Sequence, residues 1–368
     1  MKKILLFILI SFSLSEMAYC QSKSIGWVLQ NSGTNKQLYS VYCINNDTVL
    51  AVGSMGIILR TINGGLQWDS VYSGTNSELL NVKFINQNIG YIVGYDGTIL
   101  KSTNGGINWS NIGITNMVLF DVYFFNADTG WVVGGNSGGV PIGSKGVLMK
   151  TYNGGVNWII DSTLNKTISS ITFIDKDTGY YCAQNSSEPA IIRKTTNGGN
   201  SWNTVYISNG INWYYSNIQF SSAKTGYING YTEILKTDDY GLTWISNLFS
   251  VYPQSIFSFQ MMDSCYLYYS DGPDICMAEY CNNIISNCLS ALDLRGLNFI
   301  DQDYGFVVGI YGRIFKWGYY DAIYEKVKND DIKISPNPFN DKITLTFTKE
   351  YLTKDNFNIS IHCCPMKK

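Results

Sequence analysis

A short motif that recurs along the chain constrains its fold more than any other feature. Close copies of T-x-N-G-G-x-x-W occur as TINGGLQW at 61–68, STNGGINW at 102–109, TYNGGVNW at 151–158 and TTNGGNSW at 195–202, with the looser TDDYGLTW at 237–244. The tryptophans of successive copies are separated by 41, 49, 44 and 42 residues. Such a period is typical of a repeated unit of four short β-strands.

A second pattern keeps the same period and has seven copies. Each copy opens with an alternating strand of the V-x-F type and carries a large residue nine positions later, usually after a glycine. We therefore predict a hairpin, then a third strand such as GTILKS, then the NGG motif and a fourth strand. In the sixth copy we assign Tyr266 as the large residue and Cys265 to the glycine position. The opening strands are VYCIN at 41–45, VKFIN at 82–86, VYFFN at 122–126, ITFID at 171–175, IQFSS at 218–222, FSFQM at 257–261 and LNFID at 297–301.

The residue types of the NGG motif predict a structural turn with no catalytic role. The Asn or Asp side chain can accept hydrogen bonds from nearby backbone amides, and glycine adopts a positive φ that other residues resist. The tryptophan can fold back, bury its ring and donate its indole N–H to a backbone carbonyl. The residues assigned to these turns are Asn63, Gly65, Trp68, Asn104, Gly106, Trp109, Asn153, Gly155, Trp158, Asn197, Gly199, Trp202, Asp239, Gly241 and Trp244.

These motifs resemble the Asp-box, or bacterial neuraminidase repeat, and the whole unit is similar to the photosystem II stability and assembly factor family. The resemblance covers about residues 25–320 and implies a β-propeller. The expected fold class is all-β: a seven-bladed β-propeller of four-stranded antiparallel blades, plus a short C-terminal β segment. The last unit, 294–317, ends without an NGG turn, so we expect the N-terminal strand GWVLQN at 26–31 to close the ring.

The N-terminus has the order of a secretory signal: Lys2 and Lys3, an apolar run, then Ala18-Tyr19-Cys20. We expect cleavage after Cys20 and no transmembrane segment in the mature chain, because a span needs roughly 20 apolar residues. A membrane anchor and a lipidated Cys20 are the alternatives. The expected domains are a signal peptide at 1–20, the propeller at 21–320, a linker at 321–331 and a partial C-terminal sorting domain at 332–368.

The C-terminal segment resembles the start of a type A C-terminal sorting domain, which the type IX secretion system of Bacteroidetes-type bacteria reads. Its motif is Pro336, Asn337 and Pro338, followed by the alternating strand KITLTFT. Members of that family continue to a basic end through another strand pair, whereas this sequence ends in HCCPMKK. A small terminal hairpin without an export role is the alternative.

A cluster of four cysteines, Cys265, Cys276, Cys281 and Cys288, predicts two disulfides in an exported protein, with the pairing left open. The sixth unit lacks the NGG motif, so a disulfide is expected to take its place. No CxxC pair is present, and the single histidine, His362, lies far from the cluster. We therefore expect no metal site and no cofactor.

Candidate binding residues lie in the turns between second and third strands and in the insertions at 134–144, 184–189, 209–215 and 270–274. These segments are expected on one face, where exposed aromatic residues with polar neighbours favour a protein or carbohydrate site. Their alternative is an ordinary turn role. The candidates are Tyr95, Asp96, Trp213, Tyr214, Tyr231, Asp271, Asp274 and Tyr311.

The expected function is that of a monomeric, non-enzymatic module that binds an unknown surface protein or glycan. It would be secreted or held on the outer surface of a Gram-negative Bacteroidetes-type bacterium, with the type IX machinery as an export partner. A net charge of -2 and only four arginines disfavour nucleic acid. The alternative is a sialidase-like or xyloglucanase-like glycoside hydrolase, which in the second case needs a carboxylate pair from Asp96, Asp271 and Asp274.

Overall fold

The computed structural model describes most of the repeat region. The described residues are 23–136, 145–185, 187–210, 215–230, 234–247, 258–262, 266–270, 274–279, 284–290, 293–321, 332–334, 342–347 and 360–362. The chain divides into a unit of residues Ile25–Tyr320 and a second unit of Met1–Ser24 with Asp321–Lys368. Among the described residues, none belongs to a helix that is long and apolar enough to cross a bilayer.

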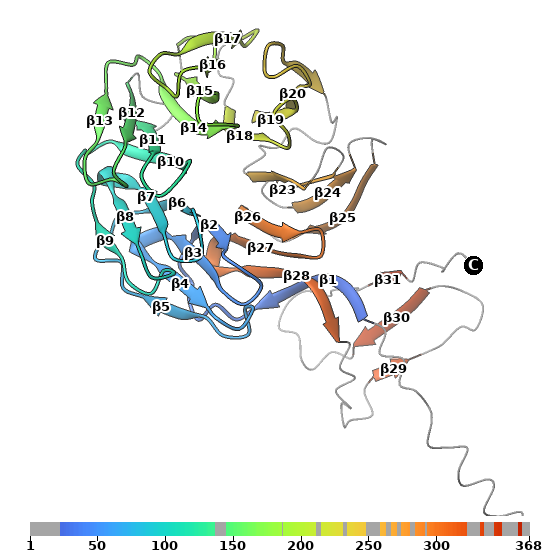
Figure 1. Cartoon of the computed structure of the whole chain (residues 1–368). Coiled ribbons are helices and arrows are strands. Elements are labelled where there is room, and N and C mark those ends of the chain that lie inside the picture. The colour runs from blue at the N-terminus through green and yellow to red at the C-terminus, as the bar shows by residue number, and fades with distance from the viewer. Residues whose placement is uncertain are drawn as a thin grey trace, which may run out of the picture. The chain divides into compact units, whose positions relative to one another are not determined.

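The larger unit is a ring of four-stranded antiparallel sheets (Figure 1). Six of them, which we call blades 1 to 6, each use four consecutive strands. They are β2 (Leu38–Cys43), β3 (Val49–Gly53), β4 (Ile58–Thr61) and β5 (Asp69–Val71); β6 (Leu79–Phe84), β7 (Gly90–Gly94), β8 (Ile99–Ser102) and β9 (Ser110–Asn111); β10 (Val118–Phe124), β11 (Gly130–Gly135), β12 (Gly146–Thr151) and β13 (Ile159–Asp161); β14 (Thr167–Phe173), β15 (Gly179–Gln184), β16 (Ile191–Thr195) and β17 (Asn203–Ile207); β18 (Tyr215–Phe220), β19 (Gly226–Gly230), β20 (Ile234–Thr237) and β21 (Ile245–Asn247); β22 (Ser258–Met261), β23 (Tyr266–Ser270), β24 (Asp274–Glu279) and β25 (Ile284–Ser290).

The predicted count of seven blades needs a correction, because six blades are formed by continuous stretches of chain. The remaining four-stranded sheet, which we call the closing sheet, is composite. It combines β26 (Leu294–Asp301), β27 (Tyr304–Gly309) and β28 (Ile314–Asp321) with β1 (Lys23–Gln30), which lies beside β28 as its outer strand. The first strands of neighbouring sheets contact one another around the ring, and β26 contacts β2. The closing sheet therefore joins the two ends of the repeat array.

The glycine that begins most second strands is required by an aromatic ring. A Cβ atom on Gly90, Gly130 or Gly305 would lie 2.2–2.5 Å from a ring atom of the phenylalanine that ends or nearly ends the first strand of the same sheet. Real Cβ contacts are not that short, so only glycine lets this ring cover the strand. This packing explains the G-Y and G-W pairs of the repeat.

Large residues of the second strands tie each sheet to the next one. The ring of Tyr91 stacks on Phe124 at a centroid distance of 3.9 Å, and that of Trp131 stacks on Phe173 at 3.9 Å. In blade 6 the equivalent contact is Tyr268 on Phe299, again at 3.9 Å. Such stacked pairs contribute about 0.5–1.5 kcal/mol beyond the area that they bury.

The sixth repeat was assigned in the wrong register. Met261 pairs with Leu267 in blade 6, as Phe220 pairs with Gly226 in blade 5. The residues of β22 that correspond to the V-x-F pattern are therefore 259–261, rather than the predicted 257–259. Its large residue is Tyr268 rather than Tyr266, and Leu267 rather than Cys265 takes the glycine position.

The repeated NGG turns are held by short-range hydrogen bonds, as predicted for their polar residues. In the first turn, Oδ1 of Asn63 accepts from the backbone N–H of Gln67 at 3.0 Å and from the Thr61 hydroxyl at 2.9 Å. The Thr61 hydroxyl in turn accepts from the N–H of Gly65. The same pattern recurs in the other four turns with Asn104, Asn153, Asn197 and Asp239.

The predicted role of the turn tryptophans is only partly right. Trp109 donates its indole N–H to the carbonyl of Gly106 at 3.2 Å. The indole nitrogens of Trp68, Trp158, Trp202 and Trp244 are buried and have no hydrogen-bond partner. Instead, all five rings meet a phenylalanine edge to face at 5.8–6.3 Å. The aromatic contact, rather than a hydrogen bond, therefore fixes most of these rings.

On several third strands, a lysine or arginine side chain donates a hydrogen bond to a backbone carbonyl in the NGG turn of the following sheet. Nζ of Lys101, for example, donates to the carbonyl of Gly154 at 2.7 Å. Equivalent bonds come from Arg60, Lys150, Lys194 and Lys316. Lys236 of blade 5 precedes the unit that lacks the motif, and it pairs with Asp238 of its own turn at 2.8 Å.

The C-terminal unit contains a three-stranded sheet in the order β29 (Ile332–Ile334), β30 (Lys342–Phe347) and β31 (Ser360–His362). The signal segment 1–20 and the sorting motif Pro336, Asn337 and Pro338 lie outside the described residues. Both assignments remain predictions.

Candidate functional site

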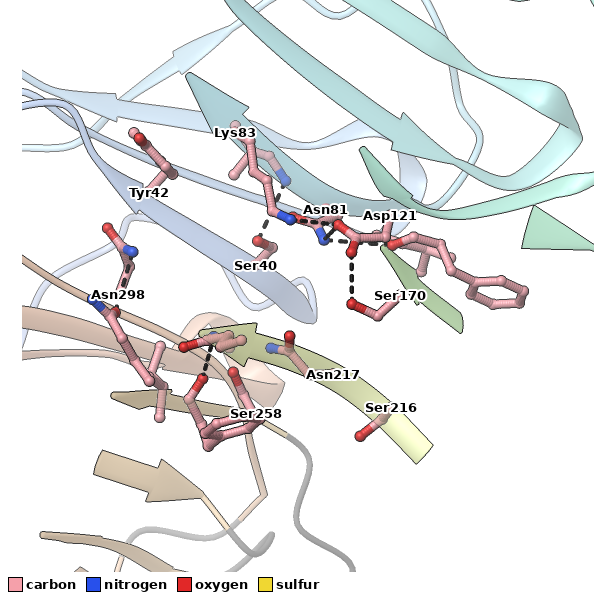
Figure 2. A pocket seen from close by; sticks show the side chains of 18 of the residues that line it. Ser40, Tyr42, Asn81, Lys83, Asp121, Ser170, Ser216, Asn217, Ser258 and Asn298 are labelled. Carbon is pink, nitrogen blue, oxygen red and sulfur yellow. Dashed lines mark hydrogen bonds and ion pairs between the residues drawn. The ribbon is translucent and has the colours of Figure 1, made fainter. Parts of the chain in front are cut away.

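A channel runs along the axis of the ring and is lined by the first strand of every sheet. Its volume is about 460 Å³. Figure 2 shows serine, asparagine and charged side chains facing it from several strands, among them Ser40, Asn81, Ser170 and Asn298. The channel wall is therefore polar, although the side chains buried within and between the sheets are mostly apolar.

Most of the polar groups of the wall bond to a neighbouring sheet. These bonds span 2.6–3.3 Å and join consecutive first strands all around the ring. They link Ser40 with Val82, Asn81 and Lys83 with Asp121, Asp121 with Ser170 and Ile171, Ser170 with Ile218, Gln219 with Phe259 and Met261, Gln260 with Phe299, and Asn298 with Cys43. Because these polar groups form hydrogen bonds with one another, the wall serves mainly to hold neighbouring sheets together and close the ring.

Asp121 is the centre of this network. Its Oδ1 accepts from Nδ2 of Asn81, Nζ of Lys83 and the N–H of Val122 at 3.0, 2.6 and 2.8 Å. Its Oδ2 accepts from the Ser170 hydroxyl at 2.7 Å and the N–H of Ile171 at 3.0 Å. The side chain is 4% exposed. A buried carboxylate with five donors joins blades 2, 3 and 4.

The channel does not contain the carboxylate pair that a glycoside hydrolase uses. Among the residues that line it, Asp121 is the single acid, and its oxygens are occupied. Of the two cations there, Lys83 pairs with Asp121 and Arg295 pairs with Asp293 at 3.2 Å. In the described part of the chain, no group of three or more His, Cys, Asp or Glu residues is placed to hold a metal ion.

At one mouth of the ring, three second-to-third-strand turns hold non-glycine residues in the left-handed region. Met55, Asp96 and Tyr311 have φ values of 55°, 54° and 56°. They lie in the short segments η1 (Ser54–Gly56), η2 (Tyr95–Gly97) and η3 (Ile310–Gly312). Each is followed by a glycine with positive φ, and each turn is closed by an i to i+3 backbone hydrogen bond of 3.0–3.2 Å. These are the features of a two-residue type I′ hairpin turn.

The residue types of two of these turns are unusual. Position 1 of a type I′ turn favours Asn, Asp or Gly, and Asp96-Gly97 follows this rule. Met55 and Tyr311 do not, and an ordinary side chain in this conformation costs roughly 1–2 kcal/mol. Both side chains are largely exposed, at 60% and 68%. Strain of this kind is concentrated at functional sites.

These three turns belong to neighbouring sheets: the closing sheet, blade 1 and blade 2. Beside Asp96, the Ser77 hydroxyl donates to its Oδ2 at 2.8 Å. The pKa of Tyr39 lies above its usual value, mainly because the side chain is buried and secondly because it forms a hydrogen bond with Glu78, so its hydroxyl stays protonated.

We call Met55, Tyr95, Asp96 and Tyr311 the turn-tip surface.

The structure brings three predicted binding residues, Tyr95, Asp96 and Tyr311, to this surface. The positions of Trp213, Tyr214, Tyr231 and Asp271 lie outside the described residues, and only the backbone of Asp274 is described, at the start of β24. Met55 was missed because it is not aromatic. The alignment of Met55-Gly56 with Asp96-Gly97 was the signal that could have found it.

The predicted disulfides involve a part of the chain that is only partly described. Cys276 lies on β24 and Cys288 on β25, while Cys265 and Cys281 fall outside the described residues. Cys43 and Cys182, which lie outside this cluster, are buried free thiols. The disulfide assignment remains a prediction.

Comparison with solved structures identifies the architecture. YCF48 from Cyanidioschyzon merolae superimposes with a TM-score of 0.63 at 18% identity, over 80% of this chain and 99% of that one. The fold is a β-propeller. The WD40 β-propeller domain of Doa1 matches this propeller with a TM-score of 0.62 at 9% identity, over 80% and 97% of the two chains. A structure described as YCF48 bound to D1 peptide gives 0.61 at 16% identity, over 80% and 99%.

Sequence comparison points to the same group for the N-terminal part of the propeller. The family described as photosynthesis system II assembly factor YCF48 matches residues 20–117 and, in a second overlapping match, residues 63–159. A comparison with curated proteins found no match. The chain is thus similar to this family from residue 20 to residue 159.

Proposed function

We propose that this propeller is a non-enzymatic interaction module that binds a segment of another protein at the turn-tip surface. The observation that carries the proposal is the pair of exposed side chains, Met55 and Tyr311, held in strained turns of neighbouring sheets. Burial of exposed Met and Tyr side chains is a common source of binding energy at protein interfaces. Because Met55 is 60% exposed, burial in the core of the propeller does not account for a methionine at this position.

The comparisons support a protein partner. One similar propeller has been solved with a bound peptide, called D1, and the matching family is described as an assembly factor. A glycoside hydrolase has less support, because the channel holds a single, fully bonded carboxylate. We further propose that the protein works outside the cell or on the outer surface, after export by the type IX system. The N-terminal signal-like segment and the SPNPF motif support this location.

Replacing the strained residues separates binding from stability. Met55→Asn and Tyr311→Asn place a favoured residue in each type I′ turn, so the free energy of unfolding should rise by about 0.5–1 kcal/mol. Capture of the partner by the immobilised protein from a surface extract of the source bacterium should fall at least tenfold. Urea denaturation and quantitative mass spectrometry of the captured proteins measure the two effects.

Leu66→Asn is the matched control, because Leu66 is 84% exposed on an NGG turn outside the turn-tip surface. Capture should be unchanged in this variant. Equal capture by wild type and by both turn-tip variants would contradict the proposal.

A further inference from the structure

A second cavity lies between blades 3 and 4, beside the NGG turn of blade 4, and it is separate from the channel. Its volume is about 350 Å³, toward the lower end of the range of ligand sites. Blade 3 contributes Phe125, Asn126 and Tyr152, and blade 4 contributes Asn200. The fully buried Trp131 also lines it.

The repeats provide an internal comparison for this cavity. Asn200 follows the NGG of its turn, a position occupied by an apolar residue in the other four turns. Tyr152 and Phe125 are aromatic at positions where none of the other copies has an aromatic residue. The equivalents of these three residues are Leu66, Ile107, Val156 and Leu242; Ile62, Thr103, Thr196 and Asp238; and Ile44, Ile85, Ile174, Ser221, Met262 and Ile300. Two aromatic rings and an amide are thus combined at this boundary alone among the described ones.

The Tyr152 ring is held in place by Lys150 and remains exposed. Nζ of Lys150 lies 4.6 Å from its centroid, and the same ammonium donates to the carbonyl of Gly198 at 2.5 Å and to Oδ1 of Asn200 at 3.1 Å. Lys150 is therefore fixed and covers one face of the ring by a cation–π contact. Tyr152 is still 53% exposed, and Phe125 is 44% exposed.

The side-chain amides of Asn126 and Asn200 lie beside these rings, and each has an Nδ2 group that can donate hydrogen bonds. Oδ1 of Asn126 accepts from the N–H groups of Asp128 and Thr129 at 2.9 and 2.7 Å, and Oδ1 of Asn200 accepts from Lys150. In the described part of the chain, neither Nδ2 donates a hydrogen bond. The charges at the rim neutralise each other, since Lys176 pairs with Asp177 at 3.0 Å.

We propose that this cavity binds a sugar ring of a neutral glycan. The apolar C–H face of a pyranose packs on an aromatic ring, and its hydroxyls accept hydrogen bonds from amide N–H groups. A charged sugar is less suitable, because Lys176 is paired with Asp177 and the buried Lys150 ammonium already donates to Gly198 and Asn200. The site is independent of the turn-tip surface, and its ligand belongs to a different chemical class.

A microarray of neutral gluco-, xylo-, manno- and galacto-oligosaccharides tests the proposal on the mature full chain. Wild type should bind at least one of these glycans. Tyr152→Ala and Phe125→Ala should each weaken the affinity about tenfold or more, whereas Tyr152→Phe keeps the ring and should bind normally. Ile62→Ala changes the matched position of blade 1, where the side chain is 62% exposed, and should have no effect.

The failure of this proposal is distinguishable from a failure of the turn-tip proposal. Met55→Asn and Tyr311→Asn should leave glycan binding unchanged. Absence of binding to every glycan on the array would overturn the inference, and so would binding that survives in Tyr152→Ala. A peptide whose binding depends on Tyr152 while the glycans fail would also overturn it. Cooperative thermal unfolding of every variant, with midpoints close to or above that of wild type, confirms that all are folded.

Discussion

Asp121→Ala is expected to lower the free energy of unfolding by about 3–5 kcal/mol, because it leaves buried donors without their acceptor. Five hydrogen bonds converge on this carboxylate from blades 2, 3 and 4. The ion pair with Lys83 is the weaker part of the effect, since that lysine is 39% exposed and water screens it. Urea denaturation followed by far-UV circular dichroism measures the loss.

Asp69→Ala is the matched control for Asp121→Ala. Asp69 is exposed, and the hydrogen bond to its Oδ1 comes from the exposed Gln67. Its removal should change the free energy of unfolding by less than about 0.5 kcal/mol. A loss below about 1 kcal/mol for Asp121→Ala would show that the channel network does not hold the ring together.

Trp131→Ala is expected to cost about 3–5 kcal/mol, the range for truncating a fully buried aromatic residue. Trp131 is 1% exposed, stacks on Phe173 and lies under the Lys150 ammonium at 5.4 Å. Trp109→Ala should cost clearly less, because Trp109 is only half-buried and contacts Phe84 edge-on at 5.9 Å. The same denaturation experiment measures both.

The order of the two losses is the informative result. A larger loss for Trp109 would mean that the NGG turns, rather than the stacked aromatic contacts between sheets, dominate the stability of the ring. That outcome would contradict the packing described for Tyr91, Trp131 and Tyr268.

The sequence was most informative where the interactions are local. The Asn63 and Thr61 side chains bond to groups at most four residues away, so residue types and spacing were enough to predict the turn. The period of the repeat and the alternation of the opening strands likewise predicted four-stranded sheets. The N-terminal strand was expected to complete the last sheet, and β1 does lie beside β28.

The remaining features depend on contacts between distant parts of the chain. The hydrogen bonds of Asp121 with Lys83 and Ser170 join residues 38 and 49 positions apart. The sequence near Asp121 therefore could not predict them. The register of the sixth unit failed because Tyr266 and Tyr268 are both large, and only the stacking of Tyr268 on Phe299 decides between them. The indole N–H of Trp68 has no hydrogen-bond partner, because its ring packs edge to face against Phe306 of another sheet.

Binding of a protein at the turn-tip surface is the central claim, and hydrogen–deuterium exchange of the complex with the captured partner tests it most directly. Exchange should slow at segments 54–57, 95–98 and 310–313 when the partner is bound, and it should stay unchanged at the NGG turn 61–68. Slower exchange at the NGG turns, with the three turn tips unaffected, would contradict the claim.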